Sequence, residues 1–287
     1  MLNEKTKENL RRKSHYIDDV QLMDNVPLFS WIDINITELC NRKCVFCPRV
    51  DESQYPNQHL HMSIKLAQKI SDELISLNYK GVIVFSGFGE PMSCPYLIDI
   101  ITIFKGFFRI EIVTNGDFLR EKNINALVNA GVDYFVISLY DGPEQLDEFT
   151  TKFKNLNLPS SSYILRDRWH NEEDSYGLKL TNRAGTINVG EQAPIDITHP
   201  CYYSAYSLTI DWNGDILLCM QDWNKKIKFG NVASQNLKDI WLSKYYNQFR
   251  KKLFNGSRSC APCNKCNTDG MLHGHNHVEL WRPKLFL

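Results

Sequence analysis

Three cysteines in one short stretch of the chain are spaced to bind a metal cluster. Cys40, Cys44 and Cys47 are separated by three and by two residues. A closed tetrahedral zinc site or an ordinary iron–sulfur cubane needs four protein ligands. A cubane held by three thiolates leaves one iron open to a ligand that is not protein, and an open metal position can do chemistry. Half of a zinc site, completed by a distant His or Cys, is the alternative.

A second group of cysteines lies toward the C-terminus. Cys201 and Cys219 flank a predicted hairpin, and the C-x2-C pair Cys263 and Cys266 follows after a gap. Four thiolates make a complete shell for a closed iron–sulfur cluster. A zinc ribbon is the alternative, because hairpins with four cysteines also bind zinc. Cys260 is surplus, and is either a replacement ligand for Cys263 or a free thiol.

Polar residues at the ends of predicted strands form a third group of candidates. A glycine-rich turn, Ser86-Gly87-Phe88-Gly89-Glu90-Pro91, follows the second strand of the predicted barrel. On charge alone, Glu90 suits an ammonium group. Asn115 and Ser138 end the next two strands, and Arg166 follows a further strand, where a guanidinium could pair with a carboxylate.

Alternating strands and helices must position these groups. Predicted strands cover residues 31–36, 81–85, 109–114, 133–139 and 161–166, with helices near 64–77, 96–104, 121–130 and 143–153. Such alternation predicts parallel βαβ units. Between Leu139 and Cys201 too few residues remain for several more units of about 30 residues each. We therefore expect an α/β fold, a partial TIM-like (β/α) barrel that is open on one side, with its active site on the loops after the strands.

The pattern changes near residue 200. Strands at 206–210 and 215–218 are joined by a segment ending in Asn-Gly, a strong hairpin signal. A helix is expected near 236–254, followed by a loop-rich tail. His273, His275 and His277 alternate in that tail, and we interpret them as a polar tail rather than a metal site. The predicted divisions are an N-terminal extension (1–30), a barrel (31–199), an auxiliary cluster module (200–270) and a C-terminal tail (271–287).

The composition limits the classes of function. The 287 residues carry a formal net charge of +0, whereas nucleic-acid or anionic-membrane partners usually require a basic excess. No apolar run approaches the roughly 18 residues of a membrane span, and residues 1–13 do not resemble a secretory signal. We therefore expect a cytoplasmic protein with no nucleic-acid or membrane partner. In a reducing compartment the nine cysteines indicate metal binding rather than disulfides.

The first cysteine motif, C-x3-C-x2-C, resembles the signature of the radical S-adenosylmethionine (SAM) superfamily. The resemblance implies a [4Fe–4S] cluster on Cys40, Cys44 and Cys47 whose open iron is chelated by SAM. One electron, from a flavodoxin- or ferredoxin-like reductant, then cleaves SAM to a 5′-deoxyadenosyl radical that abstracts a hydrogen atom from substrate carbon. The protein supplies position and electronics for this chemistry.

The glycine-rich turn resembles the GGEP motif of the same family, with Phe88 replacing the first glycine. The resemblance implies that Gly89 and Glu90 hold the SAM ammonium group. It further implies SAM contacts from the residues that match the family by position, which are Phe46, Asn115, Ser138 and Arg166.

The C-terminal cysteines resemble the start of the SPASM/twitch extension found after radical SAM barrels. Residues 229–232 and 237–241 resemble the stretch that usually follows, and residues 181–185 resemble a segment ahead of it. The later C-x5-C-x3-C part is lacking. The resemblance therefore implies the shorter twitch form, with one auxiliary [4Fe–4S] cluster on Cys201, Cys219, Cys263 and Cys266 and two clusters in all.

The reaction expected from the resemblance is hydrogen abstraction from a small polar substrate of the sugar or aminocyclitol type. Cys260 favours epimerisation, with its thiol as hydrogen-atom donor and Cys94 as the rival donor. The first alternative is dehydrogenation of a secondary alcohol to a ketone, with the auxiliary cluster as electron acceptor. The second is modification of a ribosomal peptide, although about 30 residues before the first strand are few for a peptide-recognition domain. A non-catalytic iron–sulfur or zinc scaffold is the alternative from another class.

Overall fold

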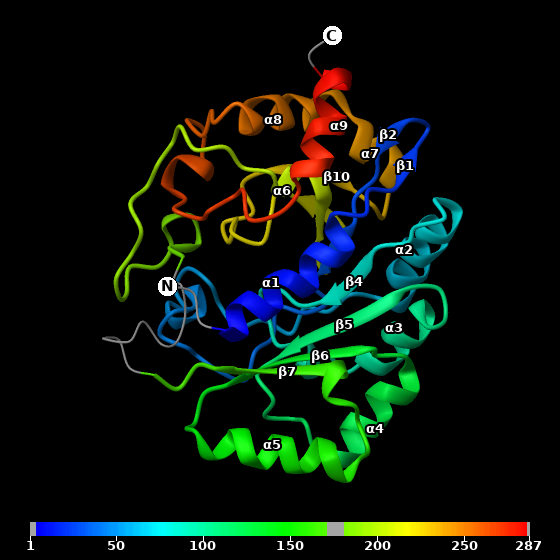
Figure 1. Ribbon diagram of the computed structural model, residues 1–287, viewed down its shortest axis with the longest axis vertical. Helices are drawn as coiled ribbons and strands as arrows, with labels where there is room; N and C mark the ends of the chain where they lie inside the picture. The colour runs from blue at the N-terminus through cyan, green and yellow to red at the C-terminus, as the bar shows by residue number, and fades with distance from the viewer. Residues whose placement is uncertain (1–3, 171–180, 286–287) are drawn as a thin grey trace.

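One eight-stranded sheet forms the centre of the structure, a computed structural model that describes residues 4–170 and 181–285 (Figure 1). In spatial order its strands are β10 (Lys228–Asn231), β9 (Asp215–Leu217), β8 (Ser207–Ile210), β3 (Trp31–Ile34), β4 (Val82–Phe85), β5 (Arg109–Thr114), β6 (Tyr134–Leu139) and β7 (Tyr163–Asp167). The strands from β8 to β7 run parallel, and β9 and β10 continue the sheet in antiparallel pairs. The predicted α/β partial barrel is confirmed.

Four helices cross between the parallel strands and cover the outer face of the sheet (Figure 1). They are α2 (Ile64–Ser76), α3 (Leu97–Phe104), α4 (Glu121–Ala130) and α5 (Glu144–Asn155). Local sequence sets their ends: Ser63 accepts a hydrogen bond from the Leu66 amide at the start of α2, and Gly131 ends α4 with φ of +117°. Short 3-10 turns lie in the connections, at η1 (Pro48–Val50), η2 (Pro91–Ser93), η3 (Ser160–Ser162), η5 (Arg183–Gly185) and η6 (Cys263–Lys265).

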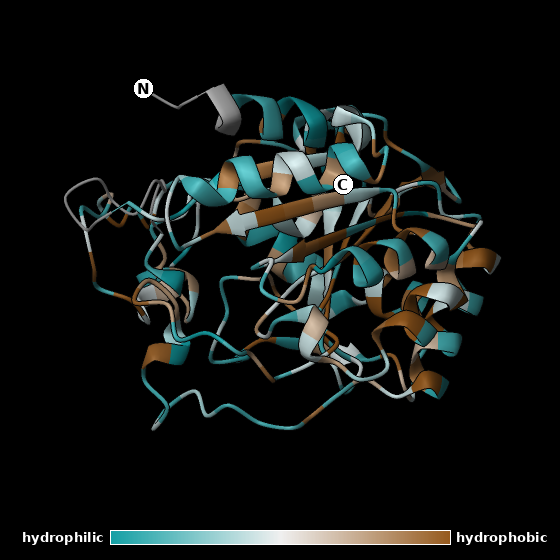
Figure 2. Cartoon of the chain, turned by 90° about the horizontal axis from the view of Figure 1, so that it is seen from below, coloured by the Kyte–Doolittle hydropathy of each residue, from teal (hydrophilic) through white to brown (hydrophobic). Residues whose placement is uncertain are grey.

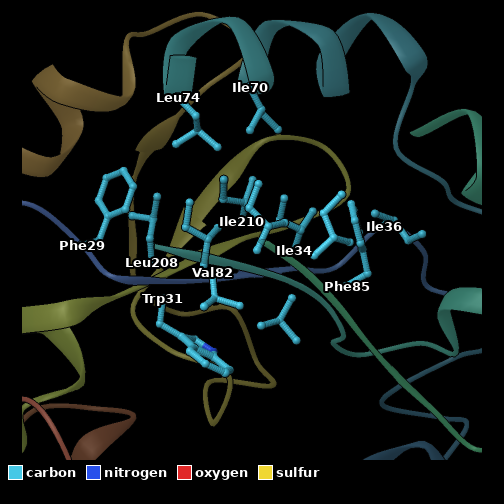
Figure 3. Close-up of a cluster of buried hydrophobic side chains, with 14 of the residues drawn as sticks. Phe29, Trp31, Ile34, Ile36, Ile70, Leu74, Val82, Phe85, Leu208 and Ile210 are labelled. Atoms are coloured by element: carbon cyan, nitrogen blue, oxygen red, sulfur yellow. The ribbon is translucent and has the colours of Figure 1, made fainter. Parts of the chain in front are cut away.

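The core lies between these helices and the sheet. Ile70 and Leu74 of α2 pack over a layer of strand residues that includes Ile34, Leu208 and Ile210 (Figure 3). All five side chains are fully buried. Figure 2 shows mostly brown strands in the interior, whereas the outer helices alternate between teal and brown along their length. Because β3 and β8 supply residues to the same layer, the core is continuous between the barrel and the C-terminal segment.

The sheet continues across the predicted boundary at residue 200. Trp31 pairs with Ser207 and Ile34 pairs with Ile210, so β8 adds directly to the barrel strand β3 after the short helix α6 (Tyr203–Tyr206). The predicted hairpin is present as β8 and β9, with Gly214 at φ of +90° in the turn. The single helix expected near 236–254 is two helices, α7 (Leu237–Leu242) and α8 (Lys244–Phe254). They are separated because the Ser243 hydroxyl caps α8.

The predicted loop-rich tail is present over residues 255–274, but residues 275–285 form a helix, so the prediction of a polar tail was wrong for that part. Helix α9 (His275–Leu285) buries Val278 and Trp281. His277 is also fully buried, with Nε2 at 2.9 Å from Ser30 Oγ and 3.0 Å from the Ile17 carbonyl. The apolar spacing of three residues along α9 is the helical signal that the alternating histidines obscured.

The N-terminal extension is also structured. Helix α1 (Glu4–Ile17) precedes a two-stranded hairpin of β1 (Leu22–Met23) and β2 (Val26–Pro27). Arg12 of α1 pairs with Glu111, a fully buried residue of β5, and lies over the Tyr134 ring at 4.5 Å. A buried carboxylate needs such a partner, so α1 covers the inner face of the sheet there. None of the helices in the described part of the chain is long and apolar enough to cross a membrane.

Candidate active site and auxiliary metal centre

The loop after β3 carries the first three cysteines and is held by polar side chains. The Asn57 side chain bonds both the amide and the carbonyl of Cys40, each at 2.8 Å. Arg42 pairs with Asp117 and Asp141, which follow β5 and β6. The loop is therefore fixed internally by Asn57 and externally to the ends of two strands, β5 and β6, as a cluster-binding loop requires.

All of the predicted SAM-site residues line one cavity together with these cysteines. The predicted residues in its wall are Cys40, Cys44, Cys47, Phe46, Gly89, Glu90, Asn115, Ser138 and Arg166. Burial raises the pKa of Cys44 to about 12, and the neighbouring thiols add to the rise. Three thiols in one partly buried wall suit a metal cluster that stabilises them as thiolates.

Glu90 joins the glycine-rich turn to the end of β5. Its carboxylate accepts hydrogen bonds from the Thr114 hydroxyl at 2.6 Å and from the Asn115 amide at 2.8 Å. Burial raises the pKa of Glu90 to about 7, although these hydrogen bonds oppose the rise. A buried carboxylate in this state gains from a cationic ligand, which fits the predicted contact with an ammonium group.

The glycines of this turn are required by close approach. A Cβ atom on Gly87 would lie 2.4 Å from Asn35 Oδ1, and one on Gly89 would lie 2.3 Å from the Thr37 carbonyl. Phe88, which departs from the family motif, points away from these contacts. Its ring is 2% exposed and packs edge-on against Trp223 at 4.9 Å between centroids. The departure thus fills a space between the barrel and the C-terminal segment.

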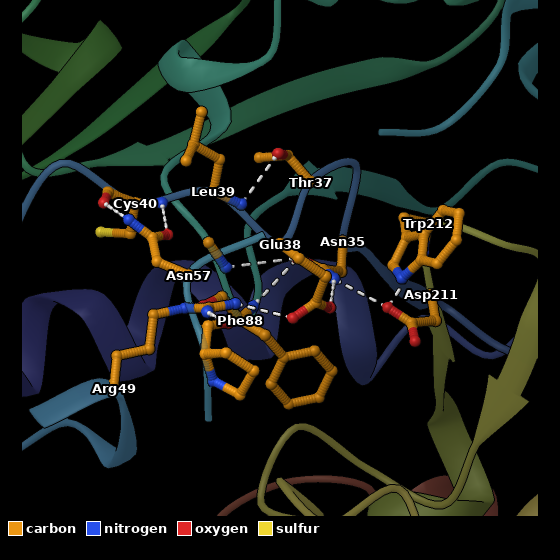
Figure 4. A network of polar contacts seen from close by, with 12 residues as sticks. Asn35, Thr37, Glu38, Leu39, Cys40, Arg49, Asn57, Phe88, Asp211 and Trp212 are labelled. Atoms are coloured by element: carbon orange, nitrogen blue, oxygen red, sulfur yellow. Dashed lines mark hydrogen bonds and ion pairs between the residues drawn. The ribbon is translucent and has the colours of Figure 1, made fainter. Parts of the chain in front are cut away.

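A buried polar network links the same turn to the hairpin of β8 and β9 (Figure 4). The Asn35 amide donates to Glu38 at 3.0 Å and to Asp211 at 2.7 Å, and its oxygen accepts from the Phe88 amide. Lys225 bridges Glu38 and Asp211 at 2.6 Å to each. Removing one partner from such a network leaves an uncompensated buried charge and costs about 3–5 kcal/mol.

At the far wall of the cavity, Arg166 Nη2 donates to Ser138 Oγ at 2.8 Å. The buried Nε of Arg166 has no hydrogen-bond partner among the described residues. An orphaned guanidinium N–H in the cavity wall suits an anionic group of a ligand. The residues present therefore fit SAM at both of its charged ends, with Glu90 for the ammonium group and Arg166 for the carboxylate.

Sequence reasoning missed several residues that line this cavity. Tyr140 stacks on Phe46 at 5.9 Å between ring centroids. Arg183 and Trp223 reach the cavity from the C-terminal side. The position of Tyr140 just after Ser138 could have indicated it. No local pattern indicates Trp223, which arrives through tertiary packing.

Arg183 lies in a strained turn that is tied to the second cysteine group. Arg183 and Ala184 both have positive φ, at +46° and +54°. The Asn182 side chain donates to the Lys265 carbonyl at 2.7 Å and accepts from the Asn267 amide at 3.3 Å, while Asn267 Oδ1 accepts from the Asn182 amide at 2.8 Å. Non-glycine residues keep such conformations only where the surroundings enforce them, commonly at functional sites.

The second cysteine group surrounds a separate cavity. Its wall holds the four predicted auxiliary ligands, Cys201, Cys219, Cys263 and Cys266. Burial and mutual repulsion of the thiols raise the pKa of Cys219 well above its usual value. Within the described residues, no three His, Cys, Asp or Glu side chains meet at one point as ligands of a single ion would.

Three buried polar atoms of this wall have no partner in the described part of the chain. They are Arg258 Nε, Ser204 Oγ and Thr268 Oγ1. Buried donors are normally satisfied, so three orphans around four thiols imply a missing acceptor. An iron–sulfur cluster, whose sulfurs accept hydrogen bonds, fits this cavity.

The two cysteines considered as hydrogen-atom donors lie outside the candidate active site. Cys260 lines neither of the two cavities, although its carbonyl accepts the Asn264 amide within the cysteine loop. Cys94 lines a different pocket, between α3 and α4. This placement gives no support to a hydrogen-donor role for either thiol.

Two known protein families match separate parts of the chain. A sequence model of the radical SAM superfamily matches residues 34–156, and a model of the SPASM iron-sulfur cluster-binding domain matches residues 201–267. The chain belongs to the radical SAM superfamily. It is an enzyme of the SPASM/twitch branch, with SAM and [4Fe–4S] clusters as cofactors and an auxiliary cluster in the SPASM region. This membership replaces the scaffold alternative.

Individual relatives agree with this membership. The S-adenosyl-L-methionine-dependent 2-deoxy-scyllo-inosamine dehydrogenase of Niallia circulans is 28% identical over 245 residues, 84% of this chain and 93% of that protein. The crystal structure of BtrN in complex with AdoMet and 2-DOIA has a TM-score of 0.72 at 26% identity, covering 88% of this chain and 98% of that chain. Native anSMEcpe with bound AdoMet, with a TM-score of 0.53 at 13% identity and coverage of 88% and 97%, shares the fold alone.

Proposed function

We propose that this radical SAM enzyme dehydrogenates a secondary alcohol of an aminocyclitol-like substrate to a ketone. The observation that carries the proposal is the similarity to the 2-deoxy-scyllo-inosamine dehydrogenase over 84% of this chain and 93% of that protein. It favours the dehydrogenase alternative over the epimerase prediction. The placement of Cys260 and Cys94 outside the cavity supports the same choice.

We assign the residues of the cavity to two tasks. Phe46, Gly89, Glu90, Asn115, Ser138 and Arg166 keep their predicted role in holding SAM. Arg183 and Tyr140 are two further polar groups in the wall, and they hold and orient the hydroxyl groups of the substrate. Phe88 and Trp223 exclude water from one side of the cavity.

Glu90 and Arg166 would hold SAM beside the site of Cys40, Cys44 and Cys47, where it would supply abstraction of one hydrogen atom from the carbinol carbon. Cys201, Cys219, Cys263 and Cys266 would hold a cluster able to accept the remaining electron, and the hydroxyl proton would leave to water. The chain's part is to keep substrate, SAM and auxiliary cluster at fixed positions. The continuous sheet through β3 and β8 and the network of Asn35, Glu38 and Asp211 support this fixed arrangement.

Three further expectations stay proposals. The division at residues 31–199 and 200–270 agrees in outline with the two matched family ranges. A flavodoxin- or ferredoxin-like protein is the expected electron donor for the SAM cluster. The cytoplasm is the expected location.

The test is turnover of the anaerobically reconstituted enzyme with 2-deoxy-scyllo-inosamine and related aminocyclitols. A dehydrogenase gives a ketone two hydrogens lighter than the substrate and one 5′-deoxyadenosine per ketone. Deuterium placed on the carbinol carbon should appear in 5′-deoxyadenosine. An epimer that has gained one deuterium from deuterated water would refute the proposal.

Two variants complete the test. Cys44→Ala should abolish SAM cleavage, because it removes a predicted ligand of the SAM cluster. Cys219→Ala should retain SAM cleavage but form no ketone, because it removes the predicted acceptor of the second electron. A Cys219→Ala enzyme that forms ketone normally would exclude the auxiliary cluster as that acceptor.

A further inference from the structure

We propose that Arg258, Thr268 and Ser204 set the reduction potential of the auxiliary cluster. All three line the cavity of the second cysteine group. Each is buried, with 3%, 8% and 0% of its surface exposed. They come from three separate parts of the C-terminal segment, so they surround the cavity rather than form one local turn.

Each residue has a buried hydrogen-bonding atom without a partner in the described part of the chain. Arg258 Nε, Thr268 Oγ1 and Ser204 Oγ are buried and have no hydrogen-bond partner among the described residues. Leaving a buried donor unsatisfied costs about 1–3 kcal/mol each. Three such groups beside four thiols could donate hydrogen bonds to the sulfurs of a bound cluster.

Arg258 is held rigidly beside one of the predicted ligands. Nη1 donates to the Thr268 carbonyl at 2.9 Å and Nη2 donates to the Pro200 carbonyl at 2.7 Å. A Cβ atom on Gly270 would lie 2.6 Å from Cys201 Sγ and 2.7 Å from Arg258 Nη2. The bare glycine therefore lets the guanidinium and the thiol lie against the same backbone atom.

Arg258 has no carboxylate as a direct partner among the described residues. Within residues 4–170 and 181–285, Arg258 forms no ion pair with a carboxylate, and its bonded nitrogens contact carbonyl oxygens. Reduction adds one negative charge to an iron–sulfur cluster. A buried positive charge and hydrogen bonds to the sulfurs stabilise the reduced form, which raises the potential. These residues thus make the auxiliary cluster a better electron acceptor.

The experiment is an EPR-monitored redox titration of the reconstituted full chain without substrate. The auxiliary signal is identified as the one that persists in a Cys40→Ala, Cys44→Ala, Cys47→Ala variant. We expect Arg258→Met to lower the equilibrium constant for reduction at least tenfold, which is about 59 mV for one electron. Thr268→Val and Ser204→Ala should each lower it about threefold, and Thr268→Ser should restore the wild-type value.

Lys265→Met is the matched control, because it removes the same charge from an exposed residue of the same cysteine loop. Lys265 does not line the cavity and its charge is screened by solvent, so its variant should leave the potential unchanged. If Arg258→Met does not retain the cluster, Thr268→Val carries the test, because the Thr268 hydroxyl bonds no other group in the described part of the chain. Unchanged potentials in Thr268→Val and Ser204→Ala would overturn the proposal. The role of a raised potential rests on the proposed dehydrogenation. The potential itself is measured without substrate, so this proposal and the proposed dehydrogenation can fail independently.

Discussion

Replacing Asn182 by alanine should uncouple SAM cleavage from substrate oxidation. The Asn182 side chain is 7% exposed and makes two hydrogen bonds to the loop that carries Cys263 and Cys266. These bonds hold the next residue, Arg183, in a left-handed conformation at the cavity wall. The Asn182→Ala substitution would leave the turn free to relax, and the Arg183 side chain would then move away from the substrate.

The expected size of the effect follows from two opposing free-energy contributions, backbone strain in the turn and the hydrogen bonds that hold it. Arg183 and Ala184 each sit at positive φ, at about 1–3 kcal/mol of strain per residue. The two lost hydrogen bonds are worth about 1 kcal/mol each. A loss of about 2 kcal/mol lowers the population of the strained turn up to about 30-fold. The apparent affinity for substrate falls with the fraction of enzyme whose turn is in the strained, binding-competent conformation. The substrate KM should therefore rise by up to the same factor.

Steady-state kinetics with separate assays for ketone and 5′-deoxyadenosine check this prediction. We expect a raised KM and more than one 5′-deoxyadenosine per ketone, because SAM can still be cleaved without a well-placed substrate. Asn264→Ala is the matched control, since Asn264 lies exposed in the same cysteine loop. An Asn182→Ala enzyme with unchanged KM and an unchanged product ratio would refute the reasoning.

Three further predictions concern stability and cluster binding. Phe88→Ala should lower the free energy of unfolding by about 3–5 kcal/mol in urea, because the ring is 2% exposed. Phe107→Ala, at a ring 60% exposed, should change it by less than about 0.5 kcal/mol, and equal losses would contradict the packing argument. Burial lowers the pKa of His277 to about 4, so its stabilising contribution is complete above pH 6.5 and is lost as the pH falls toward 4; the melting temperature of His277→Gln should fall less steeply over that range, and identical slopes would count against this account. Cys260→Ser should keep its iron content and turnover, whereas Cys263→Ser should lose the auxiliary cluster; iron analysis with the reverse result would show that Cys260 is the ligand.

The candidate site was largely predictable where local spacing or strand order determines it. The cysteine spacings determine which thiols share a loop. Asn115, Ser138 and Arg166 met in one cavity because the carboxyl ends of parallel strands lie along one edge of a sheet. The same rule placed Glu90 beside Asn115, at 2.8 Å from its amide. These predictions needed only the order of the elements.

Residues that depend on tertiary packing were not predictable. Trp223 lies four residues after Cys219, yet it packs against Phe88 of the barrel. The single helix expected near 236–254 was divided by the cap at Ser243, a local signal that was present in the sequence. The prediction of epimerisation rested on Cys260 being one cysteine more than the clusters need. A count of cysteines does not predict which cavity each side chain lines.

The pairing of β3 with β8 connects the chain segments that lead to the two sets of cysteines. The strand register places Asn35, after β3, beside Asp211, after β8, and their side chains bond at 2.7 Å. The Cys40 loop begins a few residues after Asn35, and Asp211 begins the turn of the hairpin that leads to Cys219. A rigid sheet, and not a flexible linker, therefore separates the two sets of cysteines. In the proposed dehydrogenation, electron transfer from substrate to auxiliary cluster would depend on a fixed separation, and the hydrogen-bonded pairing of two adjacent strands would supply it.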